Sequence, residues 1–99
     1  MRLKFLPAFL VAALLYSPLL SQNTDSIESL LDTIQGEAKV KALNELFRGH
    51  LRSDPVKAVS FARAALMLGT EINDRRGMAA SYNNLGVAYR NQGALDKAL

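Results

Sequence analysis

Tyr82-Asn83-Asn84-Leu85-Gly86-Val87-Ala88-Tyr89 is the stretch that decides the fold expected for this chain. Its large and small side chains recur at spacings of three and four residues, which predicts a helix with one packing face. That face comprises Tyr82, Leu85, Gly86 and Tyr89. The glycine leaves a notch between large side chains, and Ala98 is small enough to fill it from a following helix. The stretch therefore predicts a helical hairpin that turns at Gln92-Gly93-Ala94 and resumes as a helix near Leu95.

These residues resemble the helix-turn-helix unit of the tetratricopeptide repeat (TPR) family, whose pattern is W-x2-L-G-x2-Y followed by an alanine. Tyr82 stands where the family usually has tryptophan. The resemblance implies an all-α fold, with antiparallel helical hairpins stacked as the start of a TPR α-solenoid. In the family, the first helices of the repeats line a concave groove that receives a protein or peptide.

An earlier segment repeats part of this pattern, with Asn44 aligned to Asn83 and Leu46 aligned to Leu85. Ala58 then precedes Ala98 by 40 residues, compared with 34 in the commonest TPR, which resembles the longer-repeat subgroup. Phe47 replaces the notch glycine, so the first unit matches less closely. The small residues expected to pack the first hairpin are Ala58, Ala62 and Ala65.

Local start and stop signals predict four helices before the turn. A short helix over 26–34 is capped by Thr24 or Asp25 and ended by Gly36, and a second helix spans about 37–52. Asp54 and Pro55 are a cap and a first helical residue, so a third helix is expected over 55–71. A polar break over 73–77 separates it from a fourth helix over about 78–91.

The expected organisation has four parts. Residues 1–21 form a signal peptide, and residues 22–36 form a polar segment with a short helix. Residues 37–77 form the first TPR-like hairpin, and residues 78–99 form a second TPR unit truncated in its second helix. A stack of repeats needs about three units for stability. We therefore expect these residues to be the N-terminal piece of a longer chain with further TPR units, and residues 22–99 alone to fold partly or to self-associate.

The first residues have the order of a secretory signal peptide. Arg2 and Lys4 precede an uncharged run over 5–20, and a polar stretch comes next, with cleavage expected between Ser21 and Gln22. The alternative is an uncleaved anchor, but the run is shorter than the roughly 20 apolar residues of a spanning helix and is broken by prolines. We expect an exported protein, periplasmic or extracellular, that meets a membrane only through this leader or a downstream segment.

The composition argues against several chemical functions. The chain has no cysteine and one histidine, His50, which aligns with a packing tyrosine. No nucleophile, phosphate loop, carboxylate pair or metal-ligand cluster accompanies it, so we expect no catalytic residue, no cofactor and no metal. Without Arg2 and Lys4, ten Lys and Arg balance nine Asp and Glu. This near-neutral charge lacks the basic stripe that nucleic-acid binding requires.

Binding is the function that the resemblance implies. Side chains opposite the packing face would line the groove, where asparagine amides can donate to and accept from a peptide backbone. The groove candidates are Asn44, Ala80, Asn83, Asn84, Val87, Arg90 and Asn91. We expect an exported, non-catalytic TPR module that binds protein or peptide. Two alternatives stay open: the extracytoplasmic input region of a membrane sensor, such as a bacterial sensor kinase whose output domain lies elsewhere, and a helical spacer.

Overall fold

The computed structural model describes residues 19–98, and the side chains of residues 24–97, as a set of packed helices. The described elements are α2 (Leu19–Ser29), the 3-10 helix η2 (Leu31–Thr33), α3 (Gly36–His50), α4 (Pro55–Glu71) and α5 (Arg75–Ala98). This part of the chain contains no strand, so the all-α prediction is confirmed. The predicted signal peptide lies outside the described residues except for Leu19–Ser21, which begin α2.

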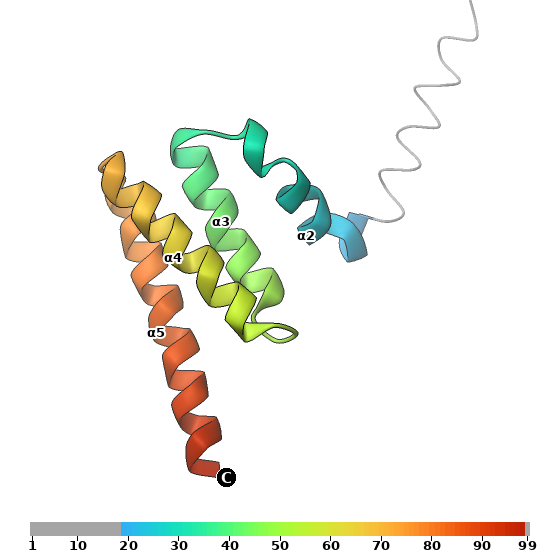
Figure 1. Ribbon diagram of the computed structural model, residues 1–99, viewed down its shortest axis with the longest axis vertical. Helices are drawn as coiled ribbons and strands as arrows, with labels where there is room; N and C mark the ends of the chain where they lie inside the picture. The colour runs from blue at the N-terminus through green and yellow to red at the C-terminus, as the bar shows by residue number, and fades with distance from the viewer. Residues whose placement is uncertain (1–18, 99) are drawn as a thin grey trace, which may run out of the picture.

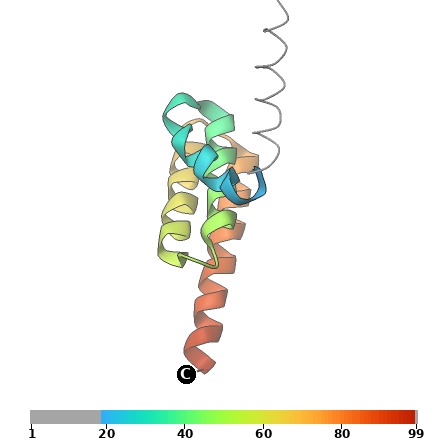
Figure 2. The ribbon, with the colours of Figure 1, turned by 90° about the vertical axis from the view of Figure 1, so that its right-hand side faces the viewer.

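The helices form a hairpin with a third long helix beside it (Figures 1 and 2). α3 packs against α4, α4 packs against α5, and α5 also touches α3. α2 lies against α3 on the side away from α5 (Figure 1). The C-terminal half of α5 continues past the turn between α3 and α4 in both views.

The α3–α4 hairpin begins and ends where its local signals predict. Asp54 caps α4, because its carboxylate Oδ1 accepts a hydrogen bond from the backbone N–H of Lys57 at 3.1 Å. Pro55 occupies the first helical position. At the other end, Asn73 adopts a left-handed conformation with φ of 59°, and the Asp74 N–H donates to the Gly69 carbonyl at 2.8 Å. This is a Schellman closure, and it ends α4 sharply.

The core of the hairpin is a seam of alanines facing larger side chains. Ala58, Ala62 and Ala65 have no exposed surface, as residues that pack the hairpin should. Because their side chains are small, α4 can lie close to the bulky residues of α3, above all to Phe47, which is 1% exposed. Two buried clusters result. One comprises Phe47, Ala58, Ala62, Leu85 and Ala88, and the other comprises Val40, Leu43 and Ala65.

Two predicted helix boundaries on the N-terminal side are wrong. The helix expected over 26–34 is instead α2, which begins earlier and ends at Ser29, followed by the separate η2. The Thr33 hydroxyl donates to the Leu30 carbonyl at 2.7 Å and competes with continued α-helix. Gly36, with φ of 65°, does not end that helix but allows the chain to turn into α3.

The predicted start of the fourth helix is also wrong. The sequence placed a polar break over 73–77, whereas α5 begins at Arg75. Asp74 caps it, since its Oδ1 accepts a hydrogen bond from the Gly77 N–H at 3.0 Å. Gly77 therefore lies inside the first turn. A Cβ there would lie closer to Val40 Cγ1 than any van der Waals contact allows, so the glycine lets α5 approach α3.

The largest correction concerns the turn expected at Gln92-Gly93-Ala94. α5 is a continuous helix of 24 residues that runs through this segment to Ala98. Breaking a helix gives up backbone hydrogen bonds, and these are compensated only when the returning segment packs. Keeping Gly93 in the helix costs only about 1 kcal/mol relative to alanine, which is less than the cost of losing those backbone hydrogen bonds. After α2 and η2, the described residues therefore contain one complete hairpin, α3–α4, and one further helix, α5, and Ala98 does not face Gly86 across a turn.

Candidate functional site

The groove between α3 and α5 is the site that the sequence placed on the first helices of the repeats. Its lining combines charged and small side chains from both helices around a cavity of about 570 Å³. α3 contributes Glu37, Ala38, Lys41, Asn44 and Arg48, and the start of α5 with its cap contributes Asp74, Arg76, Gly77 and Ala80. Of the predicted groove residues, Asn44 and Ala80 line this cavity.

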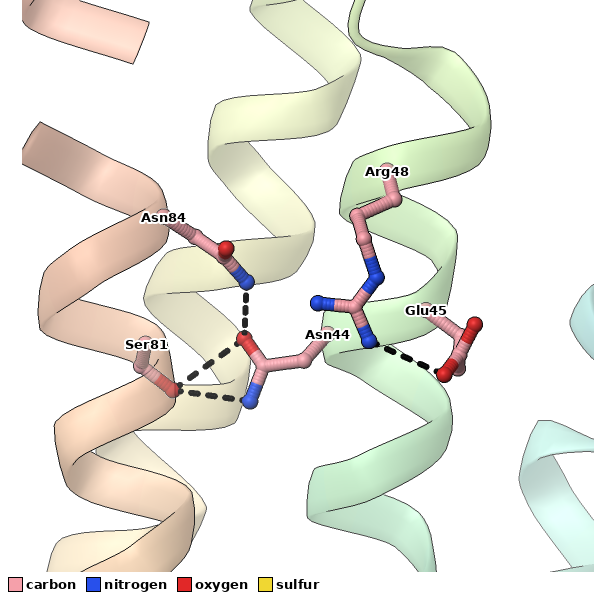
Figure 3. A network of polar contacts seen from close by, with 5 residues as sticks. All are labelled: Asn44, Glu45, Arg48, Ser81 and Asn84. Atoms are coloured by element: carbon pink, nitrogen blue, oxygen red, sulfur yellow. Dashed lines mark hydrogen bonds and ion pairs between the residues drawn. The ribbon is translucent and has the colours of Figure 1, made fainter. Parts of the chain in front are cut away.

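Asn44, which lines the groove, belongs to a buried network of amides and a hydroxyl that joins α3 to α5 (Figure 3). Asn44 on α3 is 3% exposed, and its Nδ2 donates to the Ser81 Oγ at 3.1 Å. Its Oδ1 accepts a hydrogen bond from Asn84 Nδ2 at 2.9 Å. The Ser81 hydroxyl can also donate to the Gly77 carbonyl, at 2.8 Å. Since buried polar groups need such partners, the network fixes the lateral register of α5 on α3.

This network changes the roles of two predicted contact residues. Asn44 Nδ2 donates to Ser81 Oγ and Asn84 Nδ2 donates to Asn44 Oδ1, so neither amide nitrogen is left to bind a partner. Asn84 Oδ1 has no hydrogen bond among the described residues, yet it is not one of the side-chain atoms fully shielded from solvent without a partner. Asn84 itself is 5% exposed and does not line the cavity, so its role is to hold Asn44, which does. The sequence alignment paired Asn44 with Asn83, whereas in the structure Asn44 is hydrogen-bonded to Asn84, the next residue on α5.

The other predicted groove residues are spread over different faces of α5. Val87 is half-buried, while Asn83 and Arg90 are exposed and line neither described cavity. Asn91 lines a second cavity, under the α3–α4 turn, rather than the α3–α5 groove. The structure thus brings together only Asn44, Ala80 and Asn84 of the predicted set. Helix periodicity gives the reason, because residues 80, 84, 87 and 91 share a face that 83 and 90 do not.

The walls of the groove carry charges of both signs. Arg48 is already paired with Glu45, with Nη2 and Oε1 2.9 Å apart on the exposed side of α3 (Figure 3). Lys41 and Arg76 are exposed and have no ion-pair partner among the described side chains. Sequence reasoning placed neither in the groove: Lys41 was expected on the solvent side of its helix, and Arg75-Arg76 was interpreted as a solvated pair in a loop. The groove therefore offers two available cations beside the side chain of Asn44.

A second polar cluster fastens α2 to the hairpin. The side chain of His50 is 15% exposed and stacks on Phe61, with ring centroids 5.5 Å apart. Its Nε2 lies 3.5 Å from Glu28 Oε1, and the other carboxylate oxygen lies 3.2 Å from Lys57 Nζ. Sequence reasoning expected a packed helix-face histidine there, and the half-buried ring agrees with it. The Glu28 contact joins α2 to the end of α3 and had no signal in the sequence.

The predicted repeat-packing residues of α5 fall into two groups. Leu85 is 8% exposed and packs into the core with Phe47. Tyr82, Gly86 and Tyr89 are exposed, and no atom lies within 4 Å of a Cβ built on Gly86. The prediction that Ala98 enters the Gly86 notch from a following helix is wrong for the described fold, because α5 runs on through Ala98. Exposure of Tyr82 and Tyr89 is what a unit truncated in its second helix predicts.

Comparison of the chain with family models, with curated proteins and with solved structures finds no match. The described side chains include no group of three or more His, Cys, Asp or Glu arranged to hold a metal ion. None of the helices in the described range combines the length and hydropathy needed to cross a bilayer.

Proposed function

We propose that the chain is a non-catalytic helical module that binds an extended protein or peptide segment in the groove between α3 and α5. The observation that carries this proposal is the groove itself, a cavity of about 570 Å³ lined by Asn44 and by two cations that lack ion-pair partners among the described side chains. Lys41 and Arg76 favour a segment that bears carboxylates. Asn44 is the amide side chain that lines the groove, and its contacts with Ser81 and Asn84 hold α3 and α5 together at the groove.

We also propose that α3, α4 and α5 are the start of a TPR-like stack. Three features support this: the antiparallel α3–α4 hairpin with its alanine seam, the packing of α5 beside both helices, and the contact of Asn44 with Asn84, 40 residues apart. In such a stack the α3–α5 groove lies between the first helices of successive repeats, where this family binds its partners.

The leader supports a further proposal, that the protein is exported. Two basic residues precede an uncharged run over residues 5–20, and a polar segment comes after it. Expression in a secreting bacterial host followed by intact-mass measurement tests it. We expect the periplasmic product to begin at Gln22. A product that keeps Met1 and stays in the cytoplasm would contradict export.

Binding is tested with fluorescent peptides of about ten residues, the length that spans a groove of this kind in extended form. One peptide alternates glutamate with alanine, and its matched partner alternates lysine with alanine. We expect saturable polarisation changes with the acidic peptide alone. The double variant Lys41→Ser/Arg76→Ser should weaken that binding about thirtyfold or more, since each charge-assisted contact contributes about 1 kcal/mol or more.

The matched control is Arg52→Ser/Lys97→Ser, which also removes two exposed positive charges but leaves the groove lining unchanged. We expect it to bind the acidic peptide nearly as tightly as the unmodified chain. Equal weakening by both double variants would show that binding follows net charge alone and would refute the groove. If neither peptide nor a displayed library of random peptides binds at all, the helical spacer becomes the better description.

A further inference from the structure

The exposed face of α5 that carries Tyr82 has no covering element in the described fold. Tyr82 is 60% exposed and Tyr89 is 49% exposed. Gly86 and Gly93 alternate with them along the same stripe, and a Cβ on either glycine would meet nothing within 4 Å. We call these four residues the tyrosine–glycine stripe. Large aromatic side chains beside bare backbone form a surface on which another helix can pack closely.

The two ends of this stripe carry opposite charges. Arg75 is the first residue of α5 and Asp96 lies near its last turn, and both are exposed. They are 21 residues apart, which is close to six helical turns, so both lie along the line of the tyrosines. The stripe is therefore basic at its start, aromatic with glycine gaps in its middle, and acidic at its end.

Such a pattern is complementary to itself when reversed. If a second α5 runs antiparallel about a twofold axis level with residues 85 and 86, each Arg75 lies opposite the Asp96 of the other copy. Tyr82 then lies opposite Tyr89, and the two copies of Gly86 flank the axis. In an isologous interface every such contact occurs twice, so two ion pairs and two aromatic pairs form together. The glycines at the centre allow the backbones to approach.

We propose that in the 99-residue chain the tyrosine–glycine stripe is a homodimer interface in which two copies of α5 pack antiparallel, the second copy taking the place that the next helix of a TPR-like stack would take. α4 borders the stripe without covering it: Arg63 Nη2 donates to the Tyr89 hydroxyl at 2.7 Å, and Tyr89 is still 49% exposed. Val56 on α4 is 82% exposed and lines a cavity together with Tyr89, so the apolar surface continues from the stripe onto α4. This surface is separate from the α3–α5 groove, so dimerisation and peptide binding are independent of each other.

Sedimentation equilibrium of the 99-residue chain, over about two decades of concentration around the micromolar range of small interfaces, provides the first measurement. We expect a reversible monomer–dimer equilibrium. In a dimer of Arg75→Glu chains two carboxylates face each other at both ends of the stripe, and in a dimer of Asp96→Arg chains two guanidinium groups do. Because two attractive pairs become repulsive, each variant should dimerise roughly ten- to thirtyfold more weakly. Arg76→Glu, which changes the same charge about 100° around the helix, should leave the affinity unchanged.

Mixing the two variants gives the decisive result. In a mixed dimer the acidic side chain introduced at position 75 of one chain faces the basic side chain introduced at position 96 of the other. The native Arg75 and Asp96 face each other at the opposite end, so both pairs are attractive again. With donor and acceptor dyes on the separate variants, we expect energy transfer at concentrations where neither variant alone is dimeric. The leader is the same in every chain and cannot produce this preference for the mixed pair.

Gly86→Gln tests the close approach separately. It replaces a glycine that touches nothing in the monomer with a good helix former, so helix content should hold or rise while the dimer weakens at least tenfold. A chain that sediments as a monomer throughout would assign the stripe to a different occupant and overturn the proposal. Two other results would also overturn the proposal. One is that the charge variants dimerise as tightly as the unmodified chain, and the other is that mixing Arg75→Glu with Asp96→Arg gives no more dimer than either variant alone.

Discussion

α3 and α5 present the same helical pattern to their surroundings, yet one face is buried and the other is open. On α3, Leu46 and Phe47 are at most 1% exposed beneath α4. On α5, the aligned leucine, Leu85, is buried, but Gly86 beside it is exposed, and so are both flanking tyrosines. The difference lies in the course of the chain, which returns as α4 after α3 but continues straight after the same point of α5. A packing pattern therefore indicates that a face can be covered, and the returning chain decides whether it is.

The two potential turns differ in the strength of their local signals. After α3, Asp54 is hydrogen-bonded to both helices of the hairpin. Its N–H donates to the His50 carbonyl of α3 at 2.8 Å, and its side chain caps α4. Pro55 then cannot continue an α-helix from α3, since it has no N–H to donate. After Tyr89, Gly93 is the only helix-weakening glycine or proline before the end of α5, and it costs a helix only about 1 kcal/mol. The first turn is enforced locally, whereas the second needs a tertiary partner.

Truncating Phe47 gives the largest effect expected from this comparison. Phe47→Ala leaves a void between α3, the alanines of α4 and Leu85, and should lower the free energy of unfolding by about 3–5 kcal/mol. Since small domains are stable by only about 5–15 kcal/mol, the variant should lose much of its cooperative urea transition. Tyr89→Ala, the matched truncation of an aromatic on the open face, should cost less than about 1 kcal/mol.

Urea unfolding followed by far-UV circular dichroism measures both variants, at a concentration low enough to keep the chain monomeric. A similar loss of stability for Phe47→Ala and Tyr89→Ala would show that the α5 face is covered in solution. The contrast between the two helices would then be wrong.

Gly77 separates the packed start of α5 from its free end. An added Cβ at this position would collide with Val40 on α3 and with the carboxylate of Asp74 that caps α5. We expect Gly77→Ala to lower the free energy of unfolding by about 1–3 kcal/mol through overpacking, despite the better helix propensity of alanine. The same urea titration measures it. An increase in stability would mean that α5 does not approach α3 closely at this point.

Most of the hairpin could be predicted from the sequence because its boundaries are set by contacts within a few residues. Asp54 and Pro55 predicted the start of α4, and its end at Glu71 agrees with the structure. The start of α5 was misread for a specific reason: Asp74 is a helix cap of the same kind as Asp54, but the two arginines and the glycine after it resemble a polar loop. The side-chain packing that lets a glycine lie in the first turn belongs to the tertiary structure.

The candidate site was only partly predictable for a related reason. Asn44 was identified as a groove residue, and it does line the groove. Its partner Asn84 lies 40 residues later in the sequence and is brought to it only when α5 packs on α3. A shift of one residue in the alignment changes which asparagine points inward. Lys41 and Arg76 stand out as available cations only once the ion pairs among the described side chains are known.

Gly93 gives the smallest but most direct test of how α5 ends. If this residue is helical, Gly93→Ala should raise helix content slightly and stabilise the end of α5 by up to about 1 kcal/mol, because nothing crowds its Cβ position. If the chain turned at this glycine in solution with a positive φ, alanine would instead strain the turn and lower helix content. Far-UV circular dichroism and amide hydrogen exchange over residues 90–97 distinguish the two, since slower exchange in the variant is expected only for a continuous helix. Gly77→Ala, at the packed end of the same helix, should change stability in the opposite direction, so the pair of alanine variants measures separately where α5 is supported and where it extends alone.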